Sequence, residues 1–181
     1  MTFVVAGVVT VASFLGWMVG DYYVFTRFGF SPRFLESPLQ LYRVVTSSLF
    51  HLDLQHLLGN LAIFFLFSLT IERHHPDTYL GLLIFSGVSS TLGTTLMYFL
   101  YDEEVISVGF SGVVYGVIAA FLAERPTHDF LGFIPGWIVG LVYLMKTLWE
   151  AATHHPDDHT DHFGHLGGAV GGLLYAEVVW F

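Results

Sequence analysis

Apolar stretches long enough to cross a membrane alternate with short polar connections along this chain. A helix needs about 20 mostly apolar residues to span a bilayer, and six runs come close to that length. We therefore predict spanning helices over residues 1–20, 54–71, 78–101, 105–123, 130–149 and 163–181. The pattern indicates an all-α, polytopic membrane protein whose residues 1–181 form a single six-helix membrane domain.

The connection between the first two runs, residues 21–53, differs from the other connections. It is long and combines Arg27, Arg33 and Arg43 with several phenylalanines and tyrosines. Aromatic rings and arginine stems suit the headgroup layer, where an apolar body is buried and a polar tip stays in water. A plain linker would be poor in aromatic residues. We therefore expect an interfacial loop here.

The composition strengthens the membrane interpretation. Of the 181 residues, 54% are hydrophobic and only 12% are charged, which is too apolar for a soluble domain of this size. The first run lacks the basic region and the cleavage site of a secretory signal, so we expect it to remain as a helix. No soluble domain is expected beside the helices. The chain has no cysteine, which excludes disulfides and a thiol nucleophile.

The net charge is −9, from 15 acidic and 6 basic residues. Such a surface repels nucleic acid, so none is expected as a partner. High salt would screen the self-repulsion of acidic loops. A halophilic source is therefore one hypothesis, and ordinary acidic loops are the other. We expect an integral protein of a prokaryotic plasma membrane, and its oligomeric state is left open.

Three sets of polar side chains lie within the apolar runs, where the cost of burial in lipid makes each a candidate functional group. Each set includes a second polar group or glycines at helical spacing: His56 with Asn60, Ser111 with Gly112 and Gly116, and His165 with Gly168 and Gly172. Taken singly, each has a packing explanation, because hydrogen bonds and small residues stabilise helix pairs in membranes. Together, a hydroxyl, an imidazole and an amide–imidazole pair are the components of a serine hydrolase.

The motifs that carry these side chains resemble those of rhomboid intramembrane serine proteases. The resemblance runs from about Tyr42 to about Gly172 and rests on three segments: "YRVVTSSLFHLDLQHLLGN" with Arg43, His51, His56 and Asn60; Gly109-Phe110-Ser111-Gly112 followed by Tyr115; and His165, Gly168 and Gly172. One position departs from the pattern, because the family's Trp-Arg pair reads Tyr42-Arg43 here. The resemblance implies a rhomboid-like bundle of six helices that cleaves membrane proteins in or near their transmembrane segments without a cofactor.

By resemblance, Ser111 is the nucleophile and His165 the general base of a Ser–His dyad. If residues 105–109 enter the membrane as extended chain, the helix can begin so that the serine lies in its first turn. The unpaired N–H groups of that turn would then face the developing oxyanion. Gly109 and Gly112 would let backbone and neighbouring helices crowd around the hydroxyl.

Three further side chains are expected to support the dyad. His56 and Asn60 would complete the oxyanion hole, because an imidazole and an amide can both donate hydrogen bonds to it. Tyr115, one turn after the nucleophile, would stack on the base and hold it toward the hydroxyl. No acidic residue lies in the runs that contain the hydroxyl and the amide, and Asp161 lies in a loop. We therefore expect a dyad without the carboxylate of a triad.

Two other functions remain open from the sequence. Ten histidines and the run "HHPDDHTDH" at residues 154–162 suggest a metal-ion transporter or a metal-binding membrane protein. Against this, the run has no regular spacing to hold ligands, and a transporter is expected to carry acidic residues inside its spans. A catalytically inactive rhomboid-like protein that binds membrane helices is the other alternative, which the presence of both Ser111 and His165 disfavours. No metal site is predicted.

Overall fold

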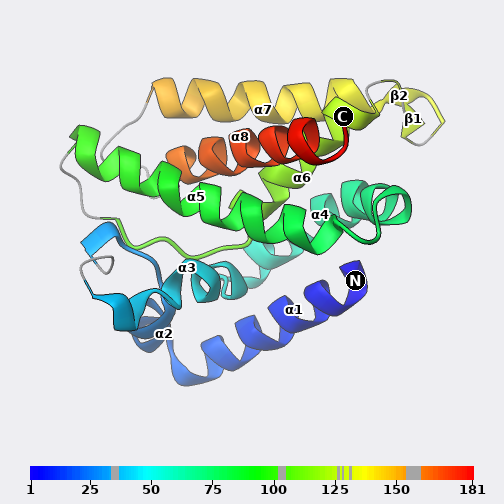
Figure 1. Cartoon of the computed structure of the whole chain (residues 1–181). Coiled ribbons are helices and arrows are strands. Elements are labelled where there is room, and N and C mark those ends of the chain that lie inside the picture. Colours follow the sequence, from blue (N-terminus) through cyan, green and yellow to red (C-terminus); the bar gives the residue numbers. More distant parts are fainter. Residues whose placement is uncertain (34–36, 102–104, 126, 128, 131, 154–159) are drawn as a thin grey trace.

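The structure is an all-α bundle, as the apolar pattern predicts (Figure 1). This computed structural model describes residues 1–33, 37–101, 105–125, 127, 129–130, 132–153 and 160–181. Its helices are α1 (Thr2–Val19), α2 (Asp21–Phe28), α3 (Arg43–Thr46), α4 (Leu54–His74), α5 (Tyr79–Tyr101), α6 (Ser111–Glu124), α7 (Gly136–Ala152) and α8 (His162–Val179). The 3-10 turns η2 (Pro38–Gln40) and η3 (Ser47–Leu49) lie between α2 and α4.

Among the helices of the described residues, α1, α4 and α5 are long and apolar enough to cross a membrane by length and composition. The apolar helix α6 has only 14 residues, because the chain before it is extended. Helices α7 and α8 have 17 and 18 residues. The full six-span arrangement therefore stays a prediction.

Helix α7 begins at Gly136, although the apolar run predicts a span from residue 130. The strands β1 (Asp129–Phe130) and β2 (Ile134–Pro135) form an antiparallel pair before it. Gly132 lies between them with φ of 76°, a conformation that favours glycine. Short apolar strands and helices cannot be told apart by periodicity alone, so the run gave no sign of this pair.

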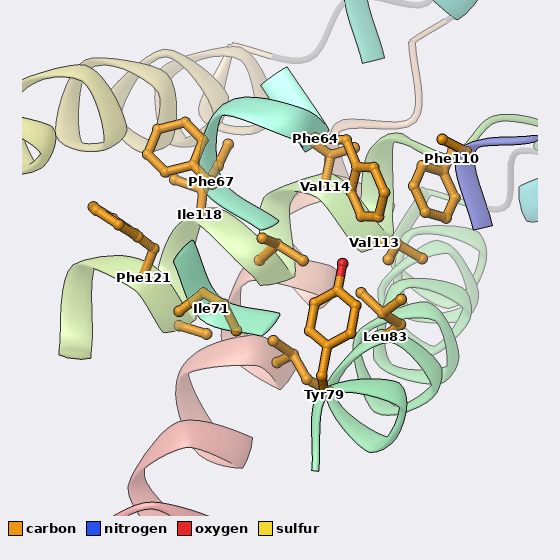
Figure 2. Packing of buried hydrophobic residues seen from close by; sticks show 14 of the residues in the cluster. Phe64, Phe67, Ile71, Tyr79, Leu83, Phe110, Val113, Val114, Ile118 and Phe121 are labelled. Carbon is orange, nitrogen blue, oxygen red and sulfur yellow. The ribbon is translucent and has the colours of Figure 1, made fainter. Parts of the chain in front are cut away.

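The core is built around α6, which contacts α4, α5, α7 and α8. Its side chains are apolar on nearly all sides, as expected for a helix that is surrounded by others, and every residue from Gly112 to Phe121 is buried. Phe121 meets Phe67 of α4 edge to face, with ring centroids 5.1 Å apart (Figure 2). Phe110 and Phe64 make a second such contact at 4.8 Å. These contacts fix α6 against α4.

Glycines bring the backbone of α8 against that of α6. A Cβ atom on Gly168 would lie 2.0 Å from the carbonyl oxygen of Gly112, and one on Gly172 would lie 2.0 Å from that of Gly116. Neither position has room for a methyl group, so the two helices pack at a distance that only glycine allows. The contact brings His165, in the first turn of α8, to the start of α6.

The long connection of residues 21–53 is folded and tied down by side chains. Arg43 is buried and donates hydrogen bonds to the carbonyl oxygens of Gly29 at 3.1 Å and Thr26 at 2.7 Å. The hydroxyl of Tyr42 donates to the carbonyl oxygen of Arg27 at 2.7 Å. The Tyr-Arg pair thus anchors the loop. Its position at the membrane surface stays a prediction.

Candidate active site

Ser111 is the first residue of α6 and follows an extended segment. In that segment Ser107 and Phe30 exchange backbone hydrogen bonds of 3.0 and 2.8 Å, and the N–H of Gly109 donates to the carbonyl oxygen of Ser47 at 2.9 Å. Extended backbone at membrane depth needs such partners. Gly109 has φ of 139°, which residues with a side chain rarely adopt. The helix therefore starts at the serine, close to the start expected from the sequence.

The hydroxyl of Ser111 is hydrogen-bonded to the imidazole of His165, with 2.7 Å between Oγ and Nε2. His165 lies in the first turn of α8, whose N-cap is Asp161. The carboxylate of Asp161 accepts from the N–H of Gly164 at 2.7 Å, and its carbonyl oxygen accepts from the N–H of His165 at 3.0 Å. The cap and the glycine contact thus bring together the serine and histidine that the sequence singled out.

Asp161 is bonded to two helices, although the sequence suggested only a loop residue. Its second carboxylate oxygen accepts from the hydroxyl of Thr94 on α5 at 2.5 Å, while the first accepts from Gly164 on α8. Burial raises the pKa of Asp161, and these hydrogen bonds partly offset that effect. The carboxylate therefore serves as a junction between α5 and the start of α8.

The imidazole of His165 is the first of three stacked aromatic rings. The ring of Tyr115 stacks on His165 with centroids 4.4 Å apart and an interplanar angle of 20°, as its spacing from Ser111 predicts. The ring of Tyr143, on α7, stacks in turn on Tyr115 at 4.5 Å and 25°. The sequence did not indicate Tyr143, because nothing in it relates the faces of α6 and α7.

Asn60 is hydrogen-bonded to His51, a contact that the sequence did not indicate. Nδ2 of Asn60 lies 2.9 Å from Nε2 of His51, and the backbone N–H of Phe110 donates to the same nitrogen at 3.3 Å. Because Nε2 accepts in both, the proton of the neutral ring lies on Nδ1, which donates to Oγ of Ser13 at 3.0 Å. Burial, with a smaller contribution from the neighbouring imidazole, lowers the pKa of His51 to about 3. His51 is therefore neutral and holds both Asn60 and the start of α6.

His56 lies beside the turn that precedes the serine. A Cβ atom on Gly109 would be 3.0 Å from Cε1 and 3.3 Å from Nε2 of the His56 ring. The same ring meets His51 edge to face, with centroids 4.9 Å apart. Asp53 caps α4 by accepting from the backbone N–H of His56 at 2.7 Å. Asn60 is thus held by a hydrogen bond to His51, whereas the ring of His56 is held by its edge-to-face contact with His51 and lies beside Gly109.

A cavity of about 1030 Å³ opens onto these groups. Its lining includes the side chains that the sequence singled out for chemistry: Ser111, His165, His56, Asn60 and Tyr115. A second cavity of about 610 Å³ shares His56, Asn60 and Tyr143 with the first. A hydroxyl bonded to an imidazole, with an amide, a second imidazole and helix N–H groups around one cavity, has the parts needed for nucleophilic acyl transfer.

The His- and Asp-rich run that suggested metal binding falls largely on residues 154–159, which lie outside the described residues. Within the part of the chain that the structure does describe, no group of three or more His, Cys, Asp or Glu side chains is placed to hold a metal ion. The metal alternative therefore gains no support from the described residues.

Comparisons with known proteins agree on one family. The family model described as "Rhomboid domain" matches residues 38–180. The chain is 30% identical over 139 residues to "RHOMBOID-like protein 7" of Arabidopsis thaliana, covering 75% of this chain and 42% of that protein. It is 29% identical over 157 residues to "Rhomboid protease GlpG" of Haemophilus influenzae, covering 81% of this chain and 74% of that protein.

Several relatives are longer than this chain. The match to "RHOMBOID-like protein 1" of Arabidopsis thaliana, 27% identical, covers 34% of that protein, and the match to "Rhomboid-like protein 11, chloroplastic" covers 51%. The chain thus spans about a third to a half of the length of these curated relatives.

Proposed function

Because this chain belongs to the rhomboid family and is an integral membrane protein, we propose that it is an intramembrane serine protease that hydrolyses peptide bonds in or near the transmembrane segments of membrane proteins. Family membership by itself admits either a protease or an inactive homologue. The observation that carries the proposal is the 2.7 Å hydrogen bond between Ser111 Oγ and His165 Nε2 on the wall of the larger cavity.

In the proposed reaction, Ser111 attacks the scissile carbonyl carbon while His165 takes the hydroxyl proton on Nε2. The imidazolium then gives that proton to the leaving amine, which leaves an acyl-enzyme. A water molecule, activated by the same imidazole, attacks the ester and releases the second product. The stack of Tyr115 on the ring supports this role, because it keeps Nε2 directed toward the hydroxyl.

The tetrahedral oxyanion would be bound by His56, Asn60 and the backbone N–H of Ser111. An amide nitrogen carries two N–H groups, so Asn60 has a second donor for the cavity beside the one that meets His51. His51 supports this arrangement by fixing the amide, and it also accepts from the backbone N–H of Phe110.

Replacing Asn60 or His56 by alanine should slow cleavage by about 10²- to 10³-fold without abolishing it, since one donor is lost and the others remain. Initial rates on a transmembrane substrate in liposomes would measure this. A loss as complete as that of Ser111→Ala would instead indicate that the residue is needed for folding, which thermal unfolding would detect.

Replacing Asp161 by asparagine should leave the cleavage rate within about threefold of wild type, because asparagine is also a good N-cap and the carboxylate is bonded to Thr94 and Gly164. The rate should be measured across a pH range beside wild type. A fall of two orders of magnitude in folded protein would show a hidden triad and contradict the dyad.

Labelling with a serine-directed fluorophosphonate tests the proposed function most directly. The wild-type protein should form a covalent adduct at Ser111, while Ser111→Ala should not, because the reagent needs an activated hydroxyl. A wild-type protein that is folded and does not label would favour the inactive homologue.

We also propose a class of substrate and a membrane for this protein. The substrate would be a membrane protein with a single spanning helix. The membrane would be the plasma membrane of a prokaryote, and the net charge of −9 supports a salt-rich habitat. Relatives include plant and animal proteins as well as a bacterial one.

A further inference from the structure

The ring of Tyr143 contributes a contact to the site from a helix that carries neither member of the proposed dyad. It stacks on Tyr115 at 4.5 Å, and Tyr115 stacks on His165 at 4.4 Å. Stacked rings at these distances attract one another beyond the area they bury. The orientation of the imidazole is therefore connected, through one intervening ring, to α7.

Tyr115 is held from α7 at more than one point. Its side chain is 2% exposed and interacts with the side chains of Tyr143 and Thr147, which lie one turn apart on that helix. Thr147 is itself 1% exposed, and its hydroxyl donates to the carbonyl oxygen of Tyr143 at 3.1 Å. A buried ring with these contacts has little freedom to rotate, so its position follows that of α7.

Helix α7 lies at the edge of the bundle, where it contacts α6 and α8 (Figure 1). Glu150 of α7 is paired with Lys146 on the same helix and lies 3.4 Å from Nδ1 of His162, at the start of α8. Tyr143 lines both cavities, and the larger one also contains Ser111 and His165 in its wall. A change in the position of α7 would therefore alter the walls of the cavities and the stack together.

We propose that Tyr143 is a positioning residue: it presses Tyr115 against His165, so that the imidazole points at Ser111 only while α7 is packed in this position. The proposal rests on the proposed protease function. A ring that fixes the imidazole matters for the rate, because a base displaced by about 1 Å can lose on the order of 100-fold in rate. Tyr143 itself need not touch the reacting atoms.

The test compares four variants with wild type in liposomes. Tyr143→Leu removes the ring but keeps an apolar side chain, and it should lower kcat about tenfold with KM changed less than about twofold. Tyr143→Phe keeps the ring and should restore kcat to within about threefold of wild type. Thr147→Val loosens Tyr115 from the same helix and should lower kcat about threefold, which provides a second measurement if Tyr143→Leu does not fold.

Leu144→Ala is the matched control. Leu144 is the next residue on α7 and packs against the same cluster of Tyr115, Ala119 and Ala169, so its truncation loosens this packing but removes no ring from the stack. Its kcat should stay within about twofold of wild type. If Tyr143→Leu and Leu144→Ala lower kcat equally, the positioning role is wrong.

A spectroscopic readout separates this inference from the proposed function. The imidazole protons of His165, assigned by comparison with His165→Ala, should carry an upfield ring-current shift from Tyr115 in wild type and in Leu144→Ala. Tyr143→Leu should lose most of that shift. An unchanged shift in Tyr143→Leu overturns the positioning role whether or not the protein cleaves, while absence of cleavage by wild type overturns only the protease function.

Discussion

Replacing Ser111 or His165 by alanine is expected to abolish hydrolysis of a transmembrane substrate, with a loss in kcat on the order of 10⁶-fold, as for the nucleophile and base of subtilisin. The reason is that the two side chains share one hydrogen bond of 2.7 Å. Without His165 the hydroxyl has no base to accept its proton, and without Ser111 the imidazole has no nucleophile to activate. Cleavage should be followed in liposomes at saturating substrate, with thermal unfolding of each variant measured in parallel.

His74→Ala provides the matched control for this experiment. His74 is exposed at the last turn of α4, roughly 27 Å along the helix from His56 at 1.5 Å per residue. Its removal should leave cleavage unchanged. Turnover close to wild type in Ser111→Ala or His165→Ala would contradict the dyad, and the remaining activity would have to come from another group.

Replacing Gly168 by alanine is expected to lower the free energy of unfolding by about 1–3 kcal/mol, because the added methyl group would overlap a packed backbone. Its Cβ would lie 2.0 Å from the carbonyl oxygen of Gly112, so α6 and α8 must move apart. The same displacement would lengthen the contact between Ser111 and His165. Stability should therefore fall together with cleavage, and unfolding in detergent would measure the first.

The identical substitution at Gly7 should have the opposite effect on stability. Gly7 lies within α1, and a Cβ atom there would meet nothing within 4 Å. Alanine favours a helix over glycine by about 1 kcal/mol where there is space for it. If Gly168→Ala were as stable as Gly7→Ala, the close contact of α6 and α8 would not exist in solution.

The sequence predicts the helices and the main polar groups because both leave local signals. Apolar runs of nearly spanning length mark α1, α4 and α5, and the spacing of Tyr115 from Ser111 predicts the stack on His165. A motif with glycine before and after the serine indicates a crowded helix start, which the structure has. These features depend on neighbours in the chain, so they can be inferred from a single sequence.

Contacts between distant helices could not be predicted in the same way. His51, which is hydrogen-bonded to Asn60, is also hydrogen-bonded to Ser13 of α1, and Tyr143 of α7 stacks on Tyr115 of α6. To predict either contact, one must know how the segments involved are rotated relative to one another. A helix that is apolar on all sides does not show which of its faces meets a given neighbour. Asp161 also gave no sign of its role, because its partner Thr94 lies on α5. The sequence signals these contacts only by placing polar residues within or beside apolar runs.

The position of the proposed base along the chain has a consequence for biosynthesis. Ser111 and His165 are 54 residues apart in the sequence, and at synthesis rates of about 5–20 residues per second the ribosome needs several seconds to add that length. During that interval the nascent membrane protein would contain the hydroxyl without its base. The enzyme would therefore be inert toward its membrane neighbours until α8 enters beside α6, and activity would be acquired only at that step of insertion.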